Sequence, residues 1–146
     1  MSVSLNQPAV LDLGSGLVQP GFAGVPTPTC IIGSIVGRPK LARVMPAASP
    51  LTLPLVGAAM ASLSGVVRVS HPLERGIIVS ANDAQALWNH VLADQLKVSH
   101  GEHPVLVTEN AFSPRGNRER IAEIFFESFQ VPSLFVAIPA VLALYA

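Results

Sequence analysis

The strongest chemical candidate in the sequence is a carboxylate followed by a glycine-rich turn. Residues 9–11 form an apolar run that predicts a buried strand, and Asp12 comes at its end. The residues that follow place two glycines around a serine: Leu13, Gly14, Ser15 and Gly16. Glycines let backbone N–H groups approach phosphate oxygens, a serine hydroxyl adds a donor, and a carboxylate can orient waters on a bound Mg²⁺. This turn is therefore a candidate phosphate site.

The same residues have a plainer interpretation, which the turn alone does not exclude. Many hairpins contain Gly-Ser-Gly only because the turn needs glycine geometry. Ser15 has no recognisable base beside it in the sequence, so a nucleophilic hydrolase is unsupported. The histidines are dispersed and Cys30 lies far from them, which gives no zinc-ligand spacing. We therefore expect no catalytic residue and no metal site built from protein side chains.

Composition limits the classes of partner. The 146 residues suit a single domain over 1–146, with 50% hydrophobic and 12% charged residues and zero formal net charge. Zero net charge removes the general attraction to nucleic acid or anionic lipid, so we expect neither as a partner. Two uncharged stretches, 44–67 and 128–146, are interrupted by prolines, which argues against a membrane span. A lone cysteine indicates a reducing compartment, and no secretory signal is visible.

The elements that must position the candidate turn follow from apolar patterning. Strands are expected at 9–12, 17–24, 29–36, 66–69, 104–109 and 134–138, with an irregular inserted loop region at 41–64. Helices are expected at 82–94, capped by Asn82 or Asp83, from Ser113-Pro114 onward, and from Pro139 onward. Their buried stripes are predicted to be Leu87, Trp88, Val91 and Leu92, then Ile121, Ile124, Phe125 and Phe129. Arg115, Arg118, Arg120, Glu119 and Glu123 are expected to form a solvated helix face. The fold class is α/β, a mixed sheet with flanking helices.

A longer set of motifs resembles a known family. The chain opens with NQPAVLDLGSG at 6–16 and GFAG at 21–24, and continues with VGRPK at 36–40, HPLERGI at 71–77 and EHPVLVTE at 102–109. It runs on through NRER at 117–120, FFE at 125–127 and AVLALYA at 140–146. These blocks, in this order, resemble the actins and actin-related proteins over nearly the whole chain, and among these the resemblance is greatest to centractin.

This resemblance implies the first half of a ribonuclease H-like fold of the actin, hexokinase and heat-shock-ATPase type. Its first phosphate loop lies where Asp12 to Leu17 lie, so Asp12, Gly14, Ser15, Gly16 and Leu17 are the expected ATP- or ADP-binding residues, with Mg²⁺. It also implies cytoskeletal partners, namely actin-like or dynactin-type protein subunits in the cytoplasm.

The departures from the family pattern predict weak nucleotide binding without hydrolysis. Leu13 replaces a polar residue, and Gln19 replaces a lysine that reaches the phosphates, which removes a charge-assisted contact. Pro139 replaces the glutamine that positions the attacking water, although proline suits a first helical position. Arg75 replaces a histidine near the nucleotide. The chain also ends at Ala146, before the second half of the family fold, which predicts an exposed apolar boundary.

Three interpretations remain open from the sequence. The first is a non-catalytic, cytoskeletal actin-like protein or fragment that acts through protein–protein contacts. The second is an actin-family ATPase, or a protein with residual nucleotide binding. The third is a short isoform without a function of its own. Region 41–64 is likewise either a surface loop without function or a filament contact.

Overall fold

A five-stranded mixed sheet forms the centre of the molecule. The structure is a computed structural model that describes residues 6–40, 54–57, 60, 65, 67–99 and 101–146. The strands are β1 (Ala9–Leu13), β2 (Leu17–Phe22), β3 (Ile32–Gly33), β9 (Val105–Thr108) and β10 (Leu134–Ala137), in the spatial order β10-β9-β1-β2-β3. Strands β1, β9 and β10 are parallel, whereas β1–β2 and β2–β3 are antiparallel. The expected α/β mixed sheet with flanking helices is confirmed.

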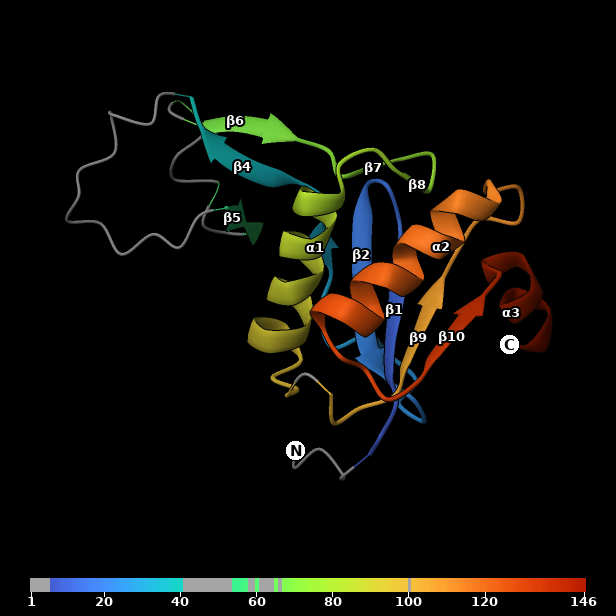
Figure 1. The fold of residues 1–146 in the computed structure, drawn as a ribbon. Helices are drawn as coiled ribbons and strands as arrows, with labels where there is room; N and C mark the ends of the chain where they lie inside the picture. Colours follow the sequence, from blue (N-terminus) through green and yellow to red (C-terminus); the bar gives the residue numbers. More distant parts are fainter. Residues whose placement is uncertain (1–5, 41–53, 58–59, 61–64, 66, 100) are drawn as a thin grey trace.

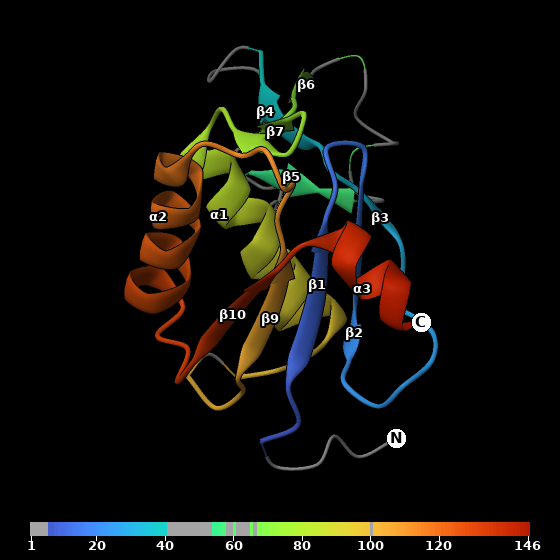
Figure 2. The same cartoon turned by 90° about the vertical axis from the view of Figure 1, so that its right-hand side faces the viewer.

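One face of this sheet is covered by two helices. These are α1 (Ala81–Asn89), continued by the π-helical segment η2 (His90–Gln95), and α2 (Arg115–Glu123), continued by η3 (Ile124–Ser128). Figures 1 and 2 show both helices on the same side of the sheet. Every residue of the two predicted stripes is buried, and Trp88 stacks on Phe125 with ring centroids 5.3 Å apart. This side holds most of the hydrophobic core.

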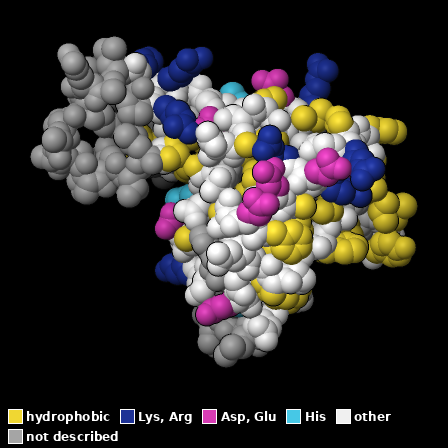
Figure 3. Space-filling view, in the orientation of Figure 1, with side chains coloured by type: hydrophobic (Ala, Val, Ile, Leu, Met, Phe, Trp, Pro, Cys, Tyr) yellow, Lys and Arg dark blue, Asp and Glu magenta, His cyan; other side chains and the backbone are white. Residues whose placement is uncertain are grey.

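Among the described elements, only α3 (Pro139–Tyr145) lies on the opposite face. Phe135 of β10 is 63% exposed there, and Leu144 and Tyr145 of α3 are each 86% exposed. Figure 3 shows hydrophobic side chains gathered on the side of the molecule where Figure 1 places α3. Because apolar side chains gain free energy by leaving water, this face is incompletely covered.

A smaller sheet and a hairpin extend from the main body. The small sheet has the order β5-β4-β6, with β4 at Val36–Pro39, β5 at Leu55–Val56 and β6 at Val67–Ser70. Arg38 and Ser70 both donate to the buried carboxylate of Asp83 on α1. Burial by itself would raise the pKa of Asp83, but the hydrogen bonds from Ser70 and Arg38 and the Arg38 charge outweigh it and lower that pKa.

The hairpin consists of β7 (Leu73–Glu74) and β8 (Ile77–Ile78). Its two-residue turn places both Arg75 and Gly76 at positive φ, 53° and 79°. That is the pattern of a type I′ turn, whose twist matches the twist of the strands. The hairpin therefore needs a residue that tolerates the left-handed region at each position, and arginine does so at some cost.

The residues predicted to cap the first two helices do not cap them. Helix α1 begins after Ser80, and Asn82 and Asp83 lie inside its first turn, where Asp83 holds Arg38 instead of capping. Helix α2 begins after Pro114, so proline is the residue before the helix and not its first residue. Ser113 caps nothing, and its hydroxyl is buried without a hydrogen-bond partner among the described residues.

Two further predictions need correction. The strand expected at 29–36 is two short strands, β3 and β4, which belong to different sheets. Of the region expected to be irregular, 41–53, 58–59 and 61–64 lie outside the described residues, whereas Leu55–Val56 forms β5 and pairs with β4. Within the described part of the chain, no helix combines the length and apolar character that a membrane crossing requires.

Candidate functional site

A pocket of about 450 Å³ lies at the carboxyl ends of the parallel strands β1, β9 and β10. Ligands of open α/β sheets bind at this edge, because the connecting loops diverge there. Side chains at the ends of all three strands line the pocket, together with Gly76 of the β7–β8 turn. The lining residues are Asp12, Leu13, Gly14, Ser15, Gly76, Thr108, Glu109, Asn110, Ala111, Phe112, Ile138, Pro139 and Ala140.

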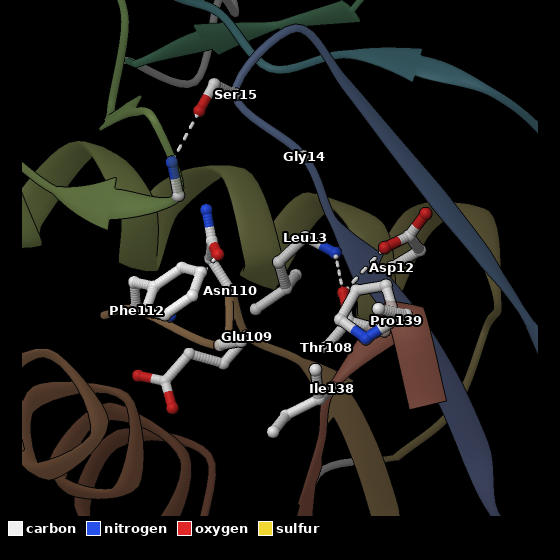
Figure 4. Close-up of a pocket in the computed structure, with 13 residues that line it drawn as sticks. Asp12, Leu13, Gly14, Ser15, Thr108, Glu109, Asn110, Phe112, Ile138 and Pro139 are labelled. Atoms are coloured by element: carbon white, nitrogen blue, oxygen red, sulfur yellow. Dashed lines mark hydrogen bonds between the residues drawn. The ribbon is translucent and has the colours of Figure 1, made fainter. Parts of the chain in front are cut away.

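Asp12 is held in place by the neighbouring strand. The Thr108 hydroxyl donates to Asp12 Oδ1 at 2.6 Å, and the backbone N–H of Leu13 donates to Thr108 Oγ1 at 2.9 Å (Figure 4). Thr108 is buried, so this short chain of bonds fixes the carboxylate at the mouth of the pocket. Leu13 itself is 6% exposed and contributes to the core.

Ser15 is joined to the β7–β8 hairpin. The backbone N–H of Gly76 donates to Ser15 Oγ at 2.8 Å. A hydroxyl that accepts one bond keeps its own proton, which is free to donate to a ligand. Gly14 is required for the tight turn, because a Cβ at that position would lie 2.4 Å from the carbonyl oxygen of Leu17.

A buried carboxylate supports the floor of the pocket. Glu109 is 5% exposed, and its two oxygens accept from Asn117 Nδ2 at 3.1 Å and from Arg118 Nε at 2.7 Å. Asn117 also donates to the Gly76 carbonyl and accepts from the Ile78 N–H. Asn117 therefore ties α2, the end of β9 and the hairpin together. Arg118 makes this ion pair while its own side chain stays 54% exposed, so its predicted place on a solvated helix face is confirmed.

The wall formed by β10 and α3 has no polar side chain. Ile138, Pro139 and Ala140 line it, and Phe112, which is 95% exposed, stands at the rim. Among the described lining residues there are two carboxylates, Asp12 and Glu109, and neither a lysine nor an arginine. The pocket thus has a polar side and an apolar side, and no positive charge of its own.

The residues predicted for the phosphate site are only partly brought together. Asp12, Gly14 and Ser15 line the pocket, whereas Gly16 and Leu17 do not, since Gly16 is exposed and Leu17 starts β2. Gln19 lies opposite Asp12 in the β1–β2 register, so the two side chains share a face of the hairpin, but Gln19 does not line the pocket.

Several lining residues were not singled out as site residues from the sequence. Thr108, Glu109 and Asn110 follow a buried strand, and polar residues at the carboxyl end of such a strand are a usable signal. No sequence pattern pointed to Gly76 or to its partner Asn117. Their hydrogen bond joins residues that are 41 positions apart. Among the described residues, no group of three or more His, Cys, Asp or Glu side chains is placed to hold a metal ion.

Comparison with known proteins shows the family of this chain. The actin family profile matches residues 4–146. The chain is 44% identical over 141 residues to an actin-like protein of Neurospora crassa, an alignment that covers 97% of this chain. It covers 37% of that relative, so the chain spans little more than a third of its length. The fold and the sequence therefore agree, and the chain belongs to the actin family.

Proposed function

We propose that this chain is a cytoskeletal actin-like protein or fragment that acts through protein–protein contacts in the cytoplasm. In this proposal residues 1–146 form one N-terminal actin-like domain, with 41–64 as an inserted loop region. Its setting resembles that of a centractin-type subunit of dynactin, and its partners are actin-like or dynactin-type subunits. Its ATP site is incomplete and does not hydrolyse ATP.

The observation that carries the proposal is the charge of the pocket lining. Actin-family proteins are weak ATPases that generally bind ATP or ADP with Mg²⁺. A nucleotide phosphate in this pocket would meet the carboxylate of Asp12 and, among the described lining residues, no lysine or arginine. Contacts between a cation and a phosphate are about twice as strong as neutral hydrogen bonds. Their absence from the lining supports weak binding that depends on Mg²⁺.

The residues present nevertheless fit part of a magnesium nucleotide. Asp12 would hold waters of the metal ion, and the Ser15 hydroxyl would donate to a phosphate oxygen. The metal ion would supply the positive charge that the lining lacks. This fit favours a second candidate function, in which the chain binds ATP or ADP without turning it over.

The apolar wall argues against hydrolysis. A general base or an orienting side chain must lie within hydrogen-bond reach of the attacking water. Ile138, Pro139 and Ala140 offer no side-chain donor or acceptor on their side of the pocket. Both oxygens of Glu109 already accept hydrogen bonds from Asn117 and Arg118, which leaves that carboxylate poorly placed to take a proton.

The exposed apolar face supports a role in protein contacts. Val141 and Leu142 of α3 are 44% and 39% exposed, and Leu144 and Tyr145 are much more so. Contiguous apolar patches on a protein surface mark interaction sites. The α3 surface, defined as these four side chains, is therefore the proposed contact with other protein subunits.

Thermal unfolding with and without Mg-ATP tests the nucleotide part of the proposal. A ligand that binds only the folded state raises the midpoint by mass action. We expect a small rise with Mg-ATP, no rise with ATP in the presence of a chelator, and no rise in an Asp12→Asn variant. A large rise that persists without Mg²⁺ would contradict the proposal, because it would require a cation that the pocket lining does not contain.

Co-sedimentation with purified centractin-type filaments tests the contact part. We expect the wild-type chain to pellet with the filaments and a Leu144→Lys variant to remain in the supernatant. The variant places a charge on a residue that is 86% exposed, so its own fold should be unaffected. Equal pelleting of both proteins, or of neither, would contradict the α3 surface as the contact.

A further inference from the structure

The outer edge of strand β10 has backbone groups without a partner strand. Strand β10 is the last strand of the five-stranded sheet, and within the described residues only β9 pairs with it. Figure 2 shows it as the outermost strand on its side of the sheet. A strand in this position presents unpaired N–H and C=O groups, which form a template for another strand.

The register shows which backbone groups are free. The carbonyls of Ser133 and Ala137 accept from β9, at 3.0 Å from Val105 N and 2.8 Å from Glu109 N. Alternate residues of a strand direct their backbone groups to the same side. The backbone N–H and C=O groups of Phe135 therefore also point to β9. The N–H and C=O groups of Leu134 and Val136 therefore point to the open edge.

This edge lacks the charged side chains and the prolines that often prevent strands from joining. Proteins protect edges with charged side chains, prolines or bulges. No charged residue occurs from 128 to 146, and β10 itself contains no proline. Its central side chain, Phe135, is 63% exposed. An uncharged, apolar edge fits another uncharged, apolar edge, since neither repels the other.

We infer that β10 pairs with β10 of a second copy of this chain, antiparallel and about a two-fold axis at Phe135. In this register Leu134 of one copy lies opposite Val136 of the other, and each of these pairs exchanges two hydrogen bonds. Phe135 then lies opposite its counterpart as a non-hydrogen-bonded pair, in which side chains approach most closely. The two five-stranded sheets become one continuous sheet.

The other exposed edges fit this role less well. Strand β3, at the far edge of the same sheet, has only two residues. Strand β6 has four, but Arg68 places a positive charge on it, and two such edges would repel. Among the described edge strands, β10 alone combines four residues with no charge.

This pairing is separate from the proposed contact through α3. Both involve the exposed apolar side of the molecule, but one uses backbone groups at the sheet edge and the other uses side chains of a helix. The β10 pairing can be wrong while the α3 contact is right, and the reverse also holds. The experiments therefore place a charge at each surface in turn.

Analytical ultracentrifugation of residues 1–146 across a dilution series tests the inference. We expect a reversible doubling of mass as the concentration rises. A Phe135→Lys variant should abolish the dimer, because it places two like charges opposite each other at the two-fold axis. Ile31→Lys is the matched control, since Ile31 is 60% exposed and precedes β3 at the opposite edge, and this variant should dimerise like the wild type. A chain that stays monomeric at every concentration would overturn the inference.

Amide hydrogen exchange identifies the surface that associates. In the dimer the amides of Leu134 and Val136 should become protected as concentration rises, whereas the amide of Phe135 should be protected at every concentration. A Leu144→Lys variant should still dimerise. If Leu144→Lys abolishes association and Phe135→Lys does not, or if Leu134 and Val136 exchange at the same rate at all concentrations, the strand pairing is wrong.

Discussion

The two faces of the central sheet differ sharply in how they are covered. The face under α1 and α2 is closed by stacked aromatic rings and by Asn117, whose bonds to Gly76 and Ile78 reach a distant segment. The face that carries α3 leaves Phe135 and most of α3 in contact with solvent. The closed face determines the fold, and the open face is where a partner gains most by binding. Substitutions on the two faces should therefore affect different measurements.

The largest effect is expected in the closed core. Phe125→Ala removes a fully buried ring that contacts both Trp88 and Phe129, and should lower the free energy of unfolding by about 3–5 kcal/mol. Phe135→Ala on the open face should lower it by about 1 kcal/mol or less. Urea unfolding of both variants measures the difference. Similar losses in the two variants would mean that the faces are equally packed.

A smaller loss is expected from the polar network under the pocket. Asn117→Ala leaves the Ile78 N–H and the Gly76 carbonyl without this partner and removes one donor from the buried Glu109. Each buried polar group left unpaired costs about 1–3 kcal/mol, so a loss of about 2 kcal/mol or more is expected. Faster exchange of the Ile78 amide should accompany it.

The matched control for that variant is Glu119→Ala on the same helix. Glu119 forms an exposed ion pair with Arg115, and such pairs contribute about 0.5 kcal/mol or less. If Asn117→Ala were as mild as Glu119→Ala, the network would not be what attaches the hairpin to α2.

The missing positive charge can be restored beside the pocket, next to Asp12. Gln19→Lys places a cation opposite Asp12 in the antiparallel pairing of β1 and β2. A charge-assisted hydrogen bond contributes about 1.5–3 kcal/mol, so Mg-ADP should bind roughly ten- to a hundredfold more tightly by calorimetry. Val69→Lys adds the same charge at an exposed position of β6 in the small sheet, and should change the affinity little. No gain with Gln19→Lys would show that charge does not limit binding.

The smallest effect concerns the attachment of the small sheet, and it is confined to acidic pH. The pKa of Asp83 is lowered in the folded state, so its contribution to stability is complete above the ordinary aspartate pKa. That contribution is lost as the pH falls through the lowered pKa of the folded protein. The stability difference between wild type and Asp83→Asn should therefore be constant near neutral pH and shrink in acid. A difference that does not change with pH would contradict this role.

Local patterns in the sequence predicted most of the closed face. The spacing of Leu87, Trp88, Val91 and Leu92 identified the buried side of α1, because helical periodicity is set by neighbouring residues. Strand β1 and the turn after it were predicted for the same reason, although β1 ends at Leu13, one residue beyond the predicted Asp12. The helix caps were missed, because Asp83 forms its hydrogen bonds with Arg38, 45 residues away, and not with the local backbone.

The candidate site was predicted only where it is local. Asp12, Gly14 and Ser15 belong to one turn and could be identified together. The partners that fix them could not, since Thr108 is 96 residues from Asp12 and Gly76 is 61 residues from Ser15. Sequence spacing contains no information about contacts that the fold creates between distant strands.

Release of phosphate from Mg-ATP by the purified chain tests the central claim most directly. The described lining residues include no cation and form one apolar wall, so we predict no release above that of buffer at any protein concentration. Release that increases in proportion to the protein, and that Asp12→Asn abolishes, would contradict the account and identify the chain as an active ATPase.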